Sequence, residues 1–186
     1  HEKKERQHNP PPPVPPIRSM AEDDSRYATL RAIHDYISLN ADYDYTAAAS
    51  SSSAYHYAYT AAPLFNGIGT MVCEGYAKTF KVLCDEFEIS CLIIEGNAFS
   101  YNTQSWEGHA WNYVRMDDGN CYAVDVTWDD QESRTEDKFF LCGDRSEGFY
   151  YYFGDSHLPD GNVDYSLGQF SFEYPQLHST GYDPAA

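Results

Sequence analysis

The stretch at residues 73–87 constrains the fold most, because its apolar residues repeat at helical spacing. They lie on one face at Cys73, Tyr76, Ala77, Phe80, Leu83, Cys84 and Phe87. An amphipathic helix with such a face must bury it against another layer. The loop at 66–70 precedes the helix, and Thr70 is expected to cap it. Cys73 then falls in the first turn, where unpaired N–H groups and the helix dipole favour a thiolate.

Two runs rich in aromatic and β-branched residues follow, at 108–116 and 120–128. They flank the turn sequence Asp117-Asp118-Gly119, which predicts an antiparallel hairpin. Further along the chain, we expect a helix at 25–39, a buried strand at 89–95 and another strand of the same sheet at 138–143.

The length of the hairpin loop decides which side chains share a face. A two-residue turn would place His109 and Asp125 on opposite faces of the sheet. A three-residue loop with Gly119 left-handed places Trp111 opposite Asp125, and His109 diagonal to Asp125 on the same face. We therefore predict the three-residue loop, or another register of the same parity.

Cys73, His109 and Asp125 are the residue types that nucleophilic acyl transfer requires. The thiol is the nucleophile, the imidazole the general base and acid, and the carboxylate orients the imidazole. The alternative for Cys73 is a small buried hydrophobe on the apolar face. Gln104, Trp106 and Trp111 are candidates for a substrate wall or an oxyanion pocket, although packing of this loop on the hairpin is the favoured explanation. The backbone N–H of Cys73 is the better oxyanion donor.

The phrases VCEGYAKTF, GHAWNYV and YAVDVTWDD, at 72–80, 108–114 and 122–130, resemble the three conserved blocks of the transglutaminase-like superfamily. Their wording is most similar to that of bacterial members described as transglutaminase-like or as cysteine proteases. The resemblance covers about residues 27–145. It implies an α+β class with a papain-like core, in which the nucleophile helix packs on an antiparallel β-sheet. It also implies the catalytic roles of Cys73, His109 and Asp125.

The remaining segments carry weaker signals. Residues 1–18 are charged and proline-rich, which predicts a linker tethering a domain at 19–186, secreted or at a cell surface. Within that domain, 146–186 is an aromatic-rich extension after the core, and it should fray from Leu177 onward. Residues 40–60 and 96–107 are expected to be loops. His34 is expected to be a satisfied, half-buried histidine, and His157 is not required by any pattern.

Composition excludes several partners. The net charge of −17 argues against nucleic acid, and no apolar run is long enough for membrane insertion. The acidic pair Asp129 and Asp130 is expected to be solvated rather than a calcium site. Apart from Cys73, four cysteines allow two disulfides in three pairings, but their apolar patterns favour buried thiols: Cys84, Cys91, Cys121 and Cys142. We expect no metal and no cofactor.

The sequence therefore predicts a thiol acyl-transfer enzyme that acts on peptide or protein amides through a thioester. Hydrolysis is slightly favoured over cross-linking, because an open groove lined by Tyr55, Tyr57 and Tyr59 would suit a peptide. The alternative is a non-catalytic transglutaminase-like module used for binding or scaffolding at a surface. An arylamine acetyltransferase would share the chemistry, but the chain lacks basic or glycine-rich evidence for coenzyme A.

Overall fold

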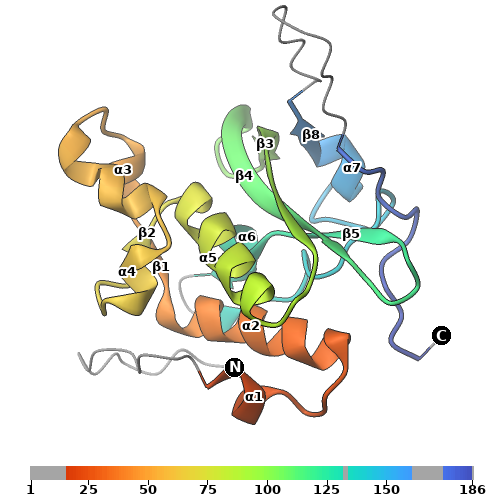
Figure 1. The fold of residues 1–186 in the computed structure, drawn as a ribbon. Coiled ribbons are helices and arrows are strands. Elements are labelled where there is room, and N and C mark those ends of the chain that lie inside the picture. Colours follow the sequence, from red (N-terminus) through yellow and green to blue (C-terminus); the bar gives the residue numbers. More distant parts are fainter. Residues whose placement is uncertain (1–15, 132–133, 161–173, 186) are drawn as a thin grey trace, which may run out of the picture.

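A computed structural model describes residues 16–131, 134–160 and 174–185. Among these, four antiparallel strands form a curled sheet in the order β5-β4-β3-β8 (Figure 1). The strands are β3 (Cys91–Ser100), β4 (Ser105–Arg115), β5 (Cys121–Val124) and β8 (His157–Pro159). The class is α+β, as predicted from the sequence.

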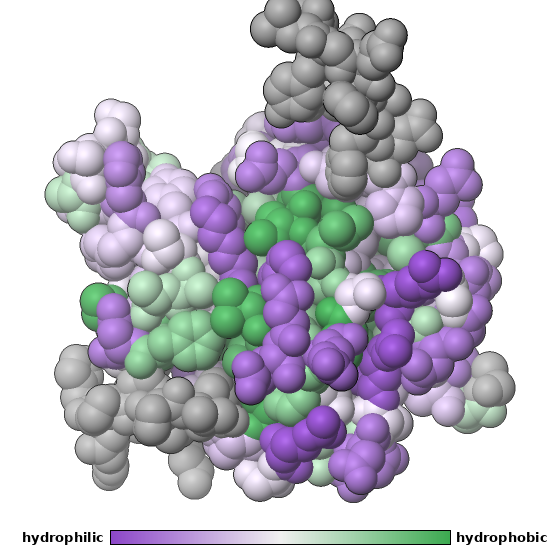
Figure 2. Space-filling view, viewed as in Figure 1, coloured by the Kyte–Doolittle hydropathy of each residue, from purple (hydrophilic) through white to green (hydrophobic). Residues whose placement is uncertain are grey.

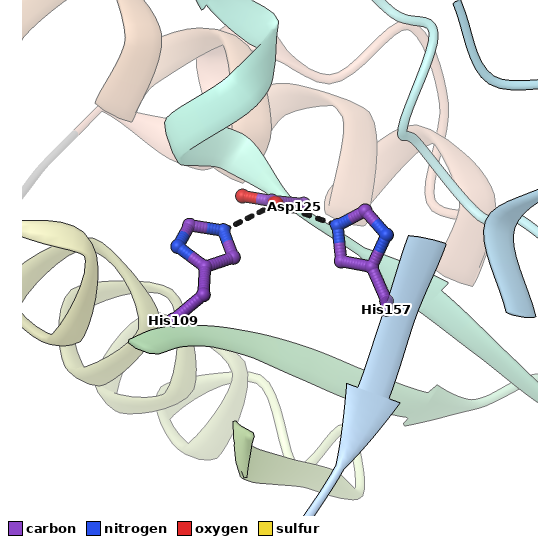
Figure 3. Close-up of side chains that lie close together, drawn as sticks. All are labelled: His109, Asp125 and His157. Carbon is purple, nitrogen blue, oxygen red and sulfur yellow. Dashed lines mark hydrogen bonds and ion pairs between the residues drawn. The ribbon is translucent and has the colours of Figure 1, made fainter. Parts of the chain in front are cut away.

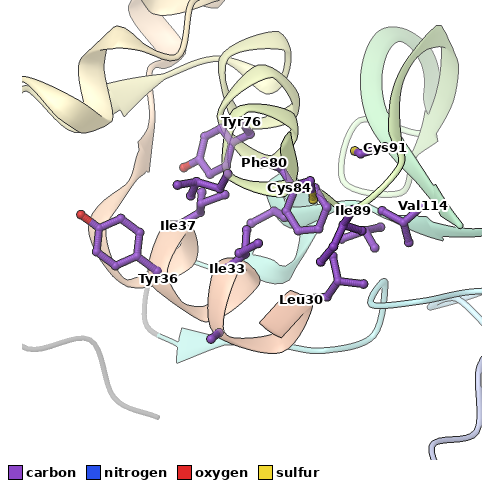
Figure 4. Packing of buried hydrophobic residues seen from close by; sticks show 14 of the residues in the cluster. Leu30, Ile33, Tyr36, Ile37, Tyr76, Phe80, Cys84, Ile89, Cys91 and Val114 are labelled. Atoms are coloured by element: carbon purple, nitrogen blue, oxygen red, sulfur yellow. The ribbon is translucent and has the colours of Figure 1, made fainter. Parts of the chain in front are cut away.

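Helix α5 (Cys73–Glu86) packs against β3 and β4, with α2 (Arg26–Asn40) beside it. Ser25 caps α2 by accepting a hydrogen bond from the Ala28 N–H. Figure 4 shows Ile33 and Ile37 of α2 meeting Phe80 and Cys84 of α5 in the main core. The apolar face that the spacing predicted is thus the buried one, and both helices agree with their predicted ranges.

A second core lies around Ile94, Trp111 and Tyr113, together with Phe139 and Phe153 from later in the chain. Phe153 begins α7 (Phe153–Ser156), which leads directly into β8. The sheet is therefore covered on two sides, and the chain after residue 138 supplies one of the covers.

The β4–β5 hairpin has the predicted register. Asn112 pairs with Val124, and Tyr113 with Ala123. Met116 and Asn120 close a three-residue loop through the Met116 N–H to Asn120 C=O bond, and Gly119 has a φ of 82°. This parity is the one that allows His109 and Asp125 to share a face.

The secondary structure predicted for three segments was wrong. Residues 96–107 are not a loop, because β3 continues to Ser100 and pairs along its whole length with β4. Residues 138–143 form no strand and contribute only an isolated bridge between Cys142 and Ala123. Residues 40–60 contain three short elements rather than one turn: β1 (Asp42–Tyr43), α3 (Tyr45–Ala48) and the 3₁₀ helix η1 (Ser53–Tyr59).

The remaining elements are short. They are α1 (Ile17–Met20), α4 (Ala62–Phe65), β2 (Thr70–Met71), α6 (Val126–Asp129), β6 (Asp130–Gln131) and β7 (Arg134–Thr135). Strand β2 pairs in parallel with β1, and β6 pairs with β7. In the described part of the chain, no helix has both the length and the apolar character needed to cross a membrane.

Both ends of the domain differ from expectation. Most of the predicted linker lies outside the described residues, but Ile17 starts α1 and is buried. The chain does not fray at Leu177, since the His178 N–H donates to Cys121 C=O and the Tyr182 N–H to Leu141 C=O. The Tyr182 ring also packs on Tyr27, at 6.1 Å between centroids. Aromatic burial therefore outweighs the end effect.

Gly96 is required where β8 joins the sheet. A Cβ at this position would lie 2.2 Å from the Leu158 carbonyl oxygen, which is backbone and cannot rotate away. We expect Gly96→Ala to lower the free energy of unfolding by about 1–3 kcal/mol, because β8 must shift. Gly108→Ala on the same hairpin is the control, since nothing lies within 4 Å of its Cβ. Urea denaturation of both variants measures the difference, and equal losses would contradict this account.

Candidate active site

Asp125 lies between two histidines (Figure 3). Its Oδ2 is 2.7 Å from His109 Nε2 and 3.2 Å from His157 Nε2. His109 comes from β4 and His157 from the first position of β8, whereas Asp125 follows β5. The fold thus brings together two of the predicted residues and one that no sequence pattern required.

The position of Asp125 follows from its local role as the N-cap of α6. Its Oδ1 accepts a hydrogen bond from the Trp128 N–H at 3.2 Å. Its own N–H donates to Phe139 C=O. The carboxylate is fully buried, so both oxygens need partners, and both have them.

Cys73 is the first residue of α5, as predicted, but the cap is Val72 rather than Thr70, which lies in β2. Valine has no side-chain oxygen, so no side chain caps this end. The first-turn N–H groups, which lack partners within the helix, are therefore left for another acceptor. Cys73 lies close enough to His109 to contribute to the raised pKa of that histidine. His109 Nε2 faces Asp125, so Nδ1 is the ring nitrogen left for the thiol.

The start of α5 lies at the base of a hollow. Figure 2 shows this hollow opening to solvent between the lobe that carries α3 and the tip of the β3–β4 hairpin. Cys73 is partly exposed, and Glu107 on the hairpin is exposed. Burial raises the pKa of Tyr43, and the charges of the nearby Cys73 and Glu107 raise it further. The site is thus closed below by the core and open above.

The charges of the site are coupled. Burial lowers the pKa of His109, but Asp125 outweighs burial and, with Cys73, raises that pKa to about 10. Burial raises the pKa of Asp125, but the charge of His109 and the hydrogen bonds from both histidines bring that pKa well below its usual value. At neutral pH, His109 is therefore an imidazolium between a carboxylate and the Cys73 thiol.

The other predicted site residues lie outside the hydrogen-bonded group of His109, Asp125 and His157. Gln104 is exposed in the β3–β4 turn and donates to Tyr101 C=O. Trp106 is 47% exposed and packs on Phe99. It is three residues from His109, so strand alternation puts the two side chains on opposite faces. Trp111 is only 1% exposed, and its ring stacks 6.0 Å from that of His109, beneath the site rather than at its surface.

Asp129 and His34 form a second buried pair. Asp129 was expected to be solvated, but it is fully buried. It is hydrogen-bonded to His34 Nε2 at 3.1 Å and accepts from the Phe139 N–H. His34 is satisfied, as predicted, although it is fully rather than half buried. Asp130 accepts a hydrogen bond from Tyr76.

Within the described residues, His109, Asp125 and His157 have the arrangement that a metal ion would need, with their donor atoms within 4.8 Å of one another. Two nitrogens and one carboxylate oxygen are ligands that suit zinc. Here, however, the same atoms already bond to each other. A metal would have to displace both N–H protons, including the one on His109 whose pKa is raised to about 10. The hydrogen-bonded network therefore satisfies these atoms without a metal.

All five cysteines are free thiols. Cys84, Cys91 and Cys142 are buried, as predicted, whereas Cys73 and Cys121 are partly exposed. Burial raises the pKa of Cys84 and of Cys121, and that of Cys142 to about 12. These three thiols are therefore poor nucleophiles.

Comparisons with known proteins agree with this architecture. The model of the transglutaminase-like superfamily matches residues 17–126. A solved structure described as that of a TGase is similar over 64% of this chain, with 16% identity and a TM-score of 0.51. This chain spans 31% of its length. A "Putative Cysteine Protease from Cytophaga hutchinsonii" matches 60% of this chain and 35% of its own, with 22% identity and a TM-score of 0.45. No curated protein matches the chain.

Proposed function

Because the chain belongs to the transglutaminase-like superfamily, we propose that it is a thiol acyl-transfer enzyme acting on peptide or protein amides. Cys73 attacks the amide carbonyl and forms a thioester. His109 protonates the leaving nitrogen and then removes a proton from the incoming nucleophile. Asp125 keeps the imidazole oriented and charged.

One observation carries this proposal: Cys73, at the start of α5, lies near a histidine whose Nε2 is held by a buried carboxylate. The first-turn N–H groups of α5, which have no partner within the helix, would stabilise the carbonyl oxygen as it gains charge during the attack.

We further propose that water is the usual acceptor, so that the reaction is hydrolysis rather than cross-linking. The support for this is that Cys73 is partly exposed and that the hollow at the start of α5 is open (Figure 2), which admits water to the thioester. Transfer to an amine would require a pocket that excludes water during deacylation.

The nucleophile is tested by alkylation with iodoacetamide at pH 6.5, followed by peptide mapping. Cys73 should react well ahead of Cys84, Cys121 and Cys142, since burial raises the pKa of those three thiols and His109 is placed to take the Cys73 proton. Cys121→Ala, which removes the other partly exposed thiol, is the matched control and should leave the labelling rate unchanged. If Cys73→Ala is labelled as fast as the wild type, the assignment is wrong.

The reaction type is tested with a pool of casein peptides as the amide substrate and dansylcadaverine as the competing amine. New terminal amines indicate proteolysis, released ammonia indicates side-chain amide hydrolysis, and dansylated peptides indicate cross-linking. We expect hydrolysis products to exceed dansylated ones, and Cys73→Ala to form none. A dominant dansylated product would overturn the preference for water.

A further inference from the structure

We propose that His157 is a positioning residue of the active site, a second histidine that holds the Asp125 carboxylate in the orientation that His109 needs. The inference rests on the proposed function for its catalytic consequence. Its structural part concerns only His157, Asp125 and His109 (Figure 3).

The fold places His157 with little freedom. It begins β8, which pairs with β3 so that His157 faces Ala98. Its ring stacks on Phe153 at 4.0 Å and 9°, and its edges contact two tryptophans, Trp111 at 5.2 Å and Trp128 at 4.6 Å. The side chain is fully buried, so the ring cannot turn away without opening this packing.

The tautomer follows from the partners. An ionised carboxylate only accepts hydrogen bonds, so Nε2 must carry the proton that faces Asp125 Oδ2. In the neutral ring, Nδ1 is then an acceptor, and the Ser156 hydroxyl, 2.9 Å from Nδ1 and 3.1 Å from Phe153 C=O, must direct its single proton to Nδ1 in this tautomer. Both ring nitrogens are thus satisfied in a neutral histidine that donates to Asp125.

The surroundings favour the neutral form. The titratable groups facing His157 are Asp125, from the start of α6, and His109, from β4; its other ring neighbours are aromatic. Burial lowers the pKa of His157 below its ordinary value, and Asp125 only partly offsets this. A neutral donor adds a hydrogen bond without adding a second positive charge beside the His109 imidazolium.

Three donors therefore immobilise Asp125. The Trp128 N–H binds Oδ1, while His109 and His157 share Oδ2. Without His157, Oδ2 of Asp125 keeps its bond to His109, and the bond from the Trp128 N–H holds Oδ1. The carboxylate can then rotate away from His109, and the imidazole loses both its orientation and the charge that raises its pKa.

The test compares His157→Gln with His157→Asn. A glutamine amide extends as far as Nε2 and can still donate to Asp125, whereas an asparagine amide is too short. Both variants bury one amide at the same place, so their packing and polarity are matched. His34→Asn controls for breaking a buried histidine–aspartate pair outside the site, because His34 bonds Asp129 in the same way.

The readout is the ¹⁵N NMR titration of His109, which needs no turnover, with kcat and KM on the casein peptides as the second measurement. In His157→Asn, we expect the His109 midpoint to fall by about one pH unit or more. We expect kcat to fall about tenfold or more with little change in KM. His157→Gln should lie near the wild type, and His34→Asn should change unfolding alone.

A His109 titration and kcat in His157→Asn that match the wild type would overturn the proposal and leave His157 as a core residue. If that variant does not fold, Ser156→Ala removes the hydroxyl donor on Nδ1 and should shift the titration in the same direction; no shift there also overturns it. Failure of the proposed function looks different. The wild type would then neither label at Cys73 nor turn over peptides, while the His109 titration would still respond to His157.

Discussion

Asp125→Asn should lower kcat/KM on the casein peptides by on the order of 10³–10⁴-fold. A neutral amide cannot stabilise the imidazolium of His109, and its NH₂ group can turn toward Nε2 and impose the wrong tautomer. Asp125 is also the residue on which both site histidines converge. The measurement is steady-state hydrolysis, with circular dichroism to confirm folding.

Asp129→Asn is the matched control. It too is a buried carboxylate bonded to a histidine, at the other end of the same short helix. We expect it to reduce stability while kcat/KM stays within a few-fold of the wild type. If the two variants lost activity equally, burial of a carboxylate in α6 rather than contact with His109 would be what matters.

The free energy of unfolding of the wild type, relative to His109→Gln, should fall by a few kcal/mol between about pH 6.5 and pH 10. The pKa of His109 is raised from 6.5 to about 10 in the folded chain, where Asp125 and Cys73 outweigh burial. Because the pKa of His109 is higher in the folded chain, its protonation stabilises the folded state fully at a pH below its pKa in the unfolded chain. That stabilisation is lost as the pH rises through its pKa in the folded chain.

Urea denaturation of both proteins across this range measures the difference. Solvent-exposed groups titrate alike in both proteins and cancel in the comparison. A difference that is constant with pH would mean that Asp125 does not hold His109 as an imidazolium, which would contradict this account of the site.

The sequence predicted most where the information was local. The spacing of apolar residues along α5 and α2 is enough to identify each helix and its buried face. The turn sequence Asp117-Asp118-Gly119 allows two registers, and the requirement that His109 and Asp125 share a face selects the three-residue loop that the structure has.

The failed predictions share a non-local cause. Residues 96–100 and 105–107 look polar, yet they pair as strands on either side of the turn at 101–104, because β3 and β4 continue each other's hydrogen bonding. Asp129 looks like a surface charge, yet His34 and the Phe139 N–H compensate its burial. For His157, the sequence showed only a histidine in an aromatic segment. No pattern predicted where β8 would join the sheet.

By itself, the sequence determined that a helix carries Cys73 at its start and that a hairpin with one of two registers follows, since helix and turn preferences act over a few residues. Only the tertiary structure decided that β8 pairs with β3 beside Gly96 and delivers His157 to Asp125. That pairing joins segments far apart in the chain. Its energy comes from burying their side chains together, which no local pattern records.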